Sequence, residues 1–138
     1  MTPIAKSRRP QAERAAEWVA VEVFGCVATR RALRTKFAKV DFFGCDVLGL
    51  AEHGVKFWIQ VTAGQMGAVQ VRRKKLTQYR WGDDDYILVM QLVERAQVDN
   101  PRRKEWFFRV WGLRRGGLWI EADPIPIKPE WFKARRET

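Results

Sequence analysis

Two apolar segments of the sequence carry polar side chains whose types can bind a metal ion or a phosphate group. Asp46 lies within residues 41–50, and Gln60 and Thr62 close residues 55–62. Alternate residues of a strand share a face, so Gln60 and Thr62 project to the same side. Antiparallel pairing of the two segments brings Asp46 close to Gln60. Such a polar cluster contributes little to packing, and we therefore interpret it as a functional site.

The element that positions these residues is a predicted β-hairpin. Both segments have the length and apolar content of strands, and only four residues separate them. The separating turn ends in Gly54, which can adopt the positive φ that such turns often need. We expect strands over residues 42–50 and 55–62.

Further periodic segments surround the hairpin. Before it, apolar residues recur at helical spacing until Gly25, which ends the pattern. After it, the basic run 72–75 opens a helix, and we expect Pro124 and Pro126 to end regular sheet structure. The predicted elements are a helix over 11–24, strands near 26–29, 42–50, 55–62, 86–93, 105–112 and 118–121, a helix between 62 and 86, and a short terminal helix from 128.

This order of elements predicts an α/β protein with a mixed β-sheet flanked by helices. The 138 residues match the size of one domain, and 46% hydrophobic with 30% charged residues is a globular composition. We assign residues 11–138 to a single domain. Residues 1–10 contain three basic residues and two prolines, and we expect them to form a mobile basic arm.

The charge of the chain predicts a polyanionic partner. The net charge is +10, and residues 1–39 alone contain nine Lys or Arg against three Glu, a net charge of +6. Such an excess of positive charge favours nucleic acid over a merely solvated surface. The residues that we expect to bind DNA are Arg8, Arg9, Arg30, Arg31, Arg34, Lys36, Lys39, Arg72, Arg73, Lys74 and Lys75.

Other classes of protein are disfavoured by the sequence. Neither a membrane-spanning apolar run nor the apolar core of a signal peptide is present, so we expect an intracellular, cytoplasmic protein, in the host cytoplasm if a virus encodes it. Cys26, Cys45 and His53 do not have the spacing of a zinc site. We expect both cysteines to be buried thiols.

The hairpin, with Asp46 on one strand and Gln60-Val61-Thr62 on the next, resembles the central hairpin of the PD-(D/E)XK nuclease superfamily. Within that superfamily the chain is most similar to archaeal-type Holliday junction resolvases, over roughly residues 13–62. The resemblance implies a restriction-endonuclease-like fold. The chain departs from the family pattern at two positions, because Gln60 stands where Glu is usual and Thr62 where a catalytic Lys is expected.

The resemblance also implies a Mg²⁺ or Mn²⁺ site for phosphodiester cleavage. Asp46 would be the essential ligand, Gln60 a neutral second ligand, the Val61 carbonyl a third, and Glu13 a support. The expected catalytic residues are Glu13, Asp46, Gln60 and Thr62. An alternative for Glu13 is an ion pair with a neighbouring arginine.

The positive charge that the family's Lys gives to the developing phosphorane needs another source here. Either a lysine from elsewhere or a second metal ion can fill this role, and the sequence leaves the choice open. The candidate lysines are Lys56, Lys74 and Lys75.

Three functions are consistent with these features. The first is a metal-dependent, structure-selective DNA endonuclease acting on branched DNA such as four-way junctions, as a homodimer because two symmetric nicks need two sites. The second is a nuclease-like fold without activity that serves as a DNA-binding module, as the departures at Gln60 and Thr62 indicate. The third is a small RNA- or ribosome-associated β protein, which charge alone supports.

Overall fold

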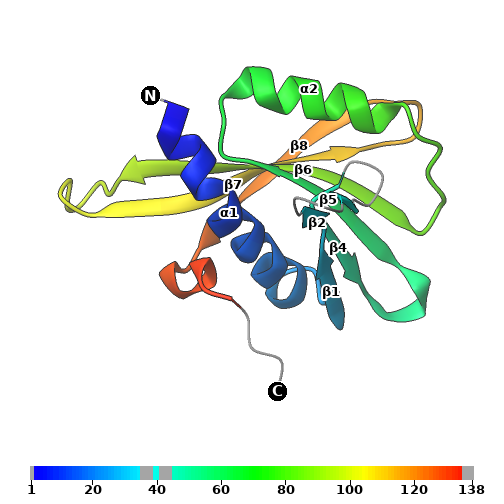
Figure 1. Ribbon diagram of the computed structural model, residues 1–138, viewed down its shortest axis with the longest axis horizontal. Helices are drawn as coiled ribbons and strands as arrows, with labels where there is room; N and C mark the ends of the chain where they lie inside the picture. Colours follow the sequence, from blue (N-terminus) through cyan, green and yellow to red (C-terminus); the bar gives the residue numbers. More distant parts are fainter. Residues whose placement is uncertain (1, 35–38, 41–44, 135–138) are drawn as a thin grey trace.

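The computed structural model describes residues 2–34, 39–40 and 45–134, with the backbone course alone for residues 2–8, 33–34 and 39–40. Its centre is a six-stranded sheet in the order β1-β4-β5-β6-β7-β8, with two helices packed on it (Figure 1). The predicted α/β architecture with a mixed sheet is confirmed. The strands are β1 (Ala28–Arg31), β4 (Val47–Leu50), β5 (Lys56–Thr62), β6 (Asp85–Ala96), β7 (Lys104–Leu113) and β8 (Trp119–Ile127). The remaining elements are α1 (Thr2–Glu22), α2 (Met66–Thr77), the paired strands β2 (Leu33–Arg34) and β3 (Lys39–Val40), and the 3₁₀ turns η1 (Glu52–Gly54) and η2 (Pro129–Phe132).

The predicted hairpin forms from β4 and β5. Val47 pairs with Ile59, and the turn η1 between the strands holds Gly54 at a φ of 79°. Glycine reaches this left-handed region without steric cost, which explains its position in the turn. The strand β5 then pairs with β6 in parallel, and α2 provides the crossover that a parallel pair requires.

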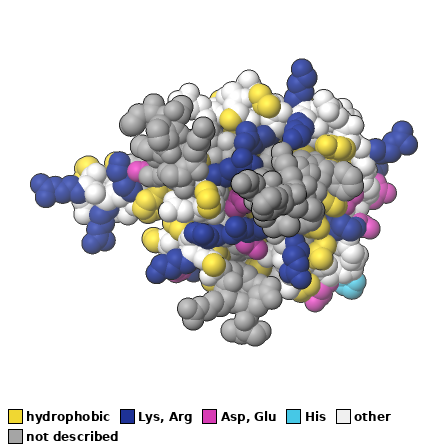
Figure 2. All heavy atoms as spheres, in the orientation of Figure 1, with side chains coloured by type: hydrophobic (Ala, Val, Ile, Leu, Met, Phe, Trp, Pro, Cys, Tyr) yellow, Lys and Arg dark blue, Asp and Glu magenta, His cyan; other side chains and the backbone are white. Residues whose placement is uncertain are grey.

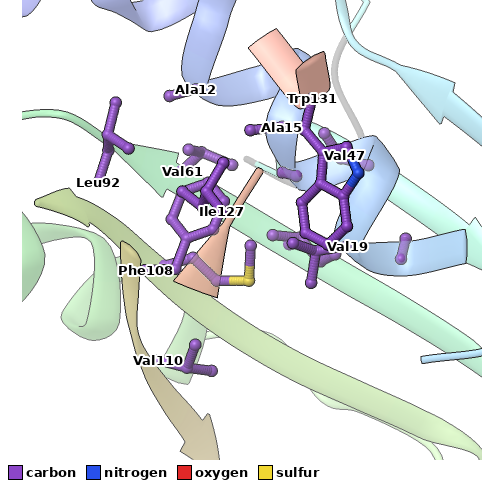
Figure 3. Close-up of a cluster of buried hydrophobic side chains, with 14 of the residues drawn as sticks. Ala12, Ala15, Val19, Val47, Val61, Leu92, Phe108, Val110, Ile127 and Trp131 are labelled. Atoms are coloured by element: carbon purple, nitrogen blue, oxygen red, sulfur yellow. The ribbon is translucent and has the colours of Figure 1, made fainter. Parts of the chain in front are cut away.

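The helix α1 covers one face of the sheet. Alanines on its buried side bring the helix close to the strands, where Val19 joins Val47, Val61 and Phe108 in the larger core cluster. Figure 3 shows these side chains converging between the helix and the sheet, with Trp131 closing the cluster from η2. This packing fixes α1 against the hairpin that carries Asp46.

The helix α2 covers the opposite face. Its buried residues Val69 and Leu76 lie seven positions apart and therefore on one side of the helix, where they pack against Ile87, Val89 and Trp111. The β5 residues Ile59 and Val61 face α1, so alternation directs their neighbours toward α2.

The predicted start of the first helix is wrong. The helix α1 begins at Thr2 and not at Gln11, so residues 2–10, expected to be an arm, are helical. Pro10 lies inside the helix. The ring of proline holds a φ that a helix accepts, and the helix continues with the loss of one backbone hydrogen bond.

Other boundaries also differ from the prediction. The first strand lies two residues later than expected, and the interval between the predicted strands 26–29 and 42–50 contains the end of β1 together with β2 and β3. The helix α2 begins at Met66, six residues before the basic run. Residues 42–44, expected to begin the first strand of the hairpin, lie outside the described residues.

The strand β8 continues through Pro124 and Pro126, against the prediction that prolines end the sheet there. These prolines are two residues apart, so their nitrogens face the same side of the strand. In the sheet order β8 is an edge strand, and its outer side needs no N–H donor. None of the helices in the described part of the chain is both long enough and apolar enough to span a bilayer.

Candidate functional site

Asp46 lies at the start of β4 with its side chain fully buried. Its backbone N–H donates to the Ile59 carbonyl over 2.8 Å, and its Oδ2 accepts the Val61 N–H over 2.7 Å. Val47 pairs with Ile59, and the Asp46 N–H also donates to the Ile59 carbonyl, so Asp46 lies beside Ile59 and one residue away from Gln60. The Val61 carbonyl also faces the end of β4, because the N–H and C=O of a strand residue point to the same side.

One guanidinium joins Asp46 to Glu13. Arg9 Nη2 donates to Asp46 Oδ1 over 3.2 Å, and Arg9 Nε lies 3.4 Å from Glu13 Oε2. Glu13 is buried, whereas the Arg9 side chain is 45% exposed. Buried carboxylates require a partner of opposite charge, and Arg9 provides it for both. Glu13 therefore forms an ion pair with a neighbouring arginine, and the same arginine holds it close to Asp46.

A second ion-pair network extends this acidic pair along α1. Arg31 Nε lies 3.9 Å from Glu13 Oε1 and 3.8 Å from Glu17 Oε1. Glu17 Oε2 also accepts a hydrogen bond from the Thr29 hydroxyl over 2.7 Å. Arg31 therefore lies close to the acidic pair, with a side chain that remains 36% exposed.

Gln60 and Thr62 are buried on the α2 face of β5. The Thr62 hydroxyl oxygen accepts the Gly64 N–H over 2.9 Å, and Gln91 Nε2 donates to the Gly64 carbonyl over 2.9 Å. Gln91 pairs with Thr62 across the parallel strands. Gln91 was missed in the sequence analysis, although a lone amide in the apolar run 86–93 was a visible signal.

A cavity of about 230 Å³ opens at the end of β5. Arg9 of α1, Thr62 of β5 and Arg72 of α2 are among the residues that line it. Two guanidinium groups beside a hydroxyl form a set of donors that suits a phosphate group. The remaining lining residues are Val61, Ala63, Gly64 and Ala68, so no lining residue is acidic.

The candidate lysines lie elsewhere. Lys56 is at the far end of β5, where its ammonium donates to the Gly54 carbonyl over 3.2 Å. Lys74 lines a separate cavity, and Lys75 is exposed on α2. Among the described side chains, Arg72 is the cation on α2 that shares a cavity with Thr62.

The other residues expected to bind DNA are only partly described. Arg30 is exposed at the edge strand β1, and Arg73 and Lys74 line one cavity beside α2. Lys and Arg side chains are spread across the face shown in Figure 2, on which acidic side chains are fewer. The side chains of Arg8, Arg34, Lys36 and Lys39 lie outside the described part of the structure.

The oxygen atoms around Asp46 and Glu13 are of the kind that could bind a divalent cation. Within residues 9–32 and 45–134, no three His, Cys, Asp or Glu side chains form a group that could share a metal ion. The Arg9 guanidinium nevertheless shows that the place between Asp46 and Glu13 accepts positive charge. Carboxylates and a backbone carbonyl are oxygen donors of the kind that Mg²⁺ and Mn²⁺ prefer. Asp46, Glu13 and the Val61 carbonyl would fit one such cation if Arg9 turned away toward solvent, whereas the Gln60 side chain lies on the α2 face of β5.

The Cys26 thiol and the pair of Arg109 with Glu121 have shifted pKa values. Burial raises the pKa of the Cys26 thiol, which keeps it protonated. Both cysteines are buried thiols, as expected. The hydrogen bond from Arg109 lowers the pKa of Glu121 and raises that of the arginine, in a pair that joins β7 to β8.

Fold and site together define a mixed α/β protein with a buried acidic pair and a two-arginine cavity at the end of its central hairpin. No family model, curated protein or solved structure matches the chain.

Proposed function

We propose that this chain is a metal-dependent DNA endonuclease with a restriction-endonuclease-like fold, as its resemblance to the PD-(D/E)XK nucleases implies. One observation carries the proposal. Asp46 and Glu13 come from different elements, and both are buried against the Arg9 guanidinium. Arg9 also lines a cavity together with Thr62 and Arg72. Acidic side chains for a metal and guanidinium groups for a phosphate are the two components that phosphodiester cleavage needs.

The order of elements supports the same proposal. A helix, three antiparallel strands, a second helix and a parallel strand occur in the order α1, β1, β4, β5, α2 and β6, with the small pair β2 and β3 between β1 and β4, and this order is compatible with a restriction-endonuclease-like fold. The acidic pair lies between α1 and the central hairpin.

Each residue of the site has a role in this proposal. Asp46, Glu13 and the Val61 carbonyl would hold the divalent cation, with Gln60 as a further ligand only if its side chain turned toward them, and the cation would polarise the phosphate and lower the pKa of a water. Arg72 supplies the positive charge that a lysine gives elsewhere in the family, because it shares the cavity with Thr62. Arg9 leaves the carboxylates for the phosphate.

The substrate and the assembly extend the proposal. We assign branched DNA, such as a four-way junction, as the substrate and a homodimer as the working form, acting in the cytoplasm. Two symmetric nicks require two sites, so the mass in solution should be twice that of the chain. Sedimentation of the protein with and without a junction measures this.

The proposal is tested with purified protein on a labelled four-way junction and a matched linear duplex, in Mg²⁺, in Mn²⁺ and in EDTA. We expect cleavage of the junction in either metal and none in EDTA. Asp46→Asn should abolish cleavage and leave junction binding unchanged or tighter, because a charge that repels phosphate is removed. Glu13→Gln should reduce cleavage less.

A second function, a DNA-binding module without catalysis, is favoured by a separate observation. Arg9 already neutralises Asp46 and Glu13, and Gln60 adds no negative charge to attract a metal. Wild-type protein that binds junctions but cleaves neither junction, flap nor duplex in either metal would establish the module and reject the enzyme.

A further inference from the structure

A second and larger cavity lies on the other side of α2, where the helix meets the start of β8. Its volume is about 540 Å³, and it is lined by Gln70, Arg73, Lys74, Thr77, Gln78 and Trp119. Figure 1 shows α2 lying over β8 in this region. The sequence analysis gave no role to Trp119.

The indole of Trp119 is held in one orientation. Its Nε1–H donates to the Thr77 hydroxyl oxygen over 3.0 Å, and that hydroxyl donates in turn to the Arg73 carbonyl over 2.8 Å. The ring is partly exposed while it packs against the smaller core cluster under α2. A partly exposed aromatic ring with a fixed orientation provides a stacking surface at little cost in side-chain entropy.

The charge of the cavity is positive. Arg73 and Lys74 are the charged residues of its lining, and the guanidinium of Arg73 lies 5.7 Å from the centre of the Trp119 ring. Gln70 and Gln78 add amide groups that both donate and accept hydrogen bonds. The ligand that matches this set is planar, anionic and able to form hydrogen bonds at its edge.

We propose that this cavity binds an unpaired nucleotide of the DNA. Its base stacks on Trp119 in the place of the Arg73 guanidinium, and the adjoining phosphates pair with Arg73 and Lys74. Stacking needs an exposed face of the base, which a base inside a duplex does not offer. A single-stranded tail or flap does offer it, so the cavity selects DNA with single-stranded character.

The position of the cavity connects it to the candidate active site. Arg72 and Arg73 are consecutive residues of α2, and they line the two cavities on different sides of the helix. A strand that crosses α2 can therefore contact both. The inference rests on the proposed binding of DNA but not on cleavage.

The test compares the affinities of the protein for a blunt duplex and for the same duplex with a single-stranded tail, by fluorescence anisotropy in EDTA. The variants are Trp119→Ala, Trp119→Phe and the control Leu118→Ala, which changes an exposed apolar neighbour outside the cavity. Wild type should bind the tailed duplex more tightly. Trp119→Ala should weaken tailed binding by about 5- to 100-fold with little effect on the blunt duplex.

The conservative change should rescue the effect. Trp119→Phe keeps an aromatic face and should retain most of the preference for the tail, and Leu118→Ala should retain all of it. Thermal unfolding reports whether each variant is folded. If Trp119→Ala is unfolded at the assay temperature, Thr77→Val decides the question, because it removes the acceptor that orients the indole and should reduce the preference for the tail.

Several results would overturn the inference. These are equal loss of tailed and blunt binding in Trp119→Ala, no loss of either, or binding of free deoxyadenosine monophosphate or of polyglutamate as tight as that of tailed DNA. Failure of wild type to bind either duplex would reject the proposed function as well. The wild-type titrations show this result before any variant is measured. A failure confined to Trp119 leaves DNA binding intact.

Discussion

Arg9 is the residue on which the proposed activity depends, because it neutralises the carboxylates that must hold the metal. Arg9→Gln should expose the place between Asp46 and Glu13 to a divalent cation. We expect tighter Mn²⁺ binding in the absence of DNA, measured by titration calorimetry. The unfolding free energy in EDTA should fall by about 1–3 kcal/mol, less than for a fully buried pair because the Arg9 side chain is 45% exposed. Mg²⁺ should restore it.

The matched control is Arg14→Gln, which removes the same charge from a nearby position of α1. It should leave Mn²⁺ affinity unchanged. If Arg9→Gln loses stability and gains no affinity for Mn²⁺, Arg9 is a permanent counter-ion and the DNA-binding module is the better description of the protein.

Gln60 is the second residue whose replacement is informative. Gln60→Glu restores the carboxylate usual in the family and gives the site a third negative charge. A buried carboxylate without a partner is unfavourable, so the variant should be less stable than wild type in EDTA by at least about 1 kcal/mol. Addition of Mg²⁺ should recover this loss if Gln60 faces the metal. Thermal unfolding with and without Mg²⁺ measures both values.

Gln91→Glu is the control for this change, because it adds the same charge one strand away. It also removes the Nε2 donor to the Gly64 carbonyl. Its loss of stability should therefore persist in Mg²⁺. Equal behaviour of the two variants would show that position 60 has no special relation to a metal.

At the scale of residues, the sequence predicted the positions of side chains that follow from the alternation of residues along a strand. That Asp46 comes close to the end of β5 needs only the hairpin and its turn, and the structure forms this hairpin, with Asp46 beside Ile59. The link through Arg9 was hidden because it depends on α1 continuing through Pro10. Gln91 and Arg72 reach the site through a parallel pairing and a helix phase, which are properties of the tertiary structure and not of local spacing.

At the scale of elements, Gly49 of β4 packs closely against α1 and against Cys26, which follows α1 in the chain. A Cβ added to Gly49 would lie 2.7 Å from Cys26 Sγ and 3.3 Å from Ala20 Cβ. Gly49→Ala should therefore destabilise the protein by about 1–3 kcal/mol, through displacement of buried atoms. Chemical denaturation at neutral pH measures the loss.

A double-mutant cycle tests the cause. Cys26→Ala removes the sulfur atom, so adding Gly49→Ala to it should cost less than in wild type. Gly67→Ala is the control, since nothing lies within 4 Å of its added Cβ and it occupies α2. That change should stabilise the helix slightly. An additive cycle would assign the loss to Ala20 or to the backbone.

The elements themselves were predictable where their periodicity was strong. The strands of the hairpin, β6 and β7 follow from apolar runs, α1 from its helical spacing, and the presence of α2 from the basic run between two strands. Proline caused the main errors, because its effect depends on where the element lies. Pro10 is tolerated inside α1, and Pro124 and Pro126 are tolerated because β8 is an edge strand, which the sequence does not state.

At the scale of the whole molecule, the excess of positive charge should control DNA binding. The net charge is +10, and the run 72–75 carries four cations on α2. Each phosphate that a cation neutralises releases condensed counterions, so affinity falls as salt rises. We expect the affinity for a four-way junction to fall by about an order of magnitude or more between roughly 50 and 200 mM salt.

Single substitutions locate the contacts that produce this salt dependence. Lys75→Gln, on exposed α2, should reduce the slope of log affinity against log salt by about 1, as expected for one phosphate contact. Arg115→Gln is the control, because Arg115 is exposed in the turn between β7 and β8 and pairs with Asp83 over 2.7 Å. It should leave the slope unchanged.

Two results would contradict these predictions. Affinity that stays flat over the salt range would show that the charge serves a partner other than nucleic acid. An equal effect of both variants would show that the phosphate contacts are spread over the surface and not gathered on α2.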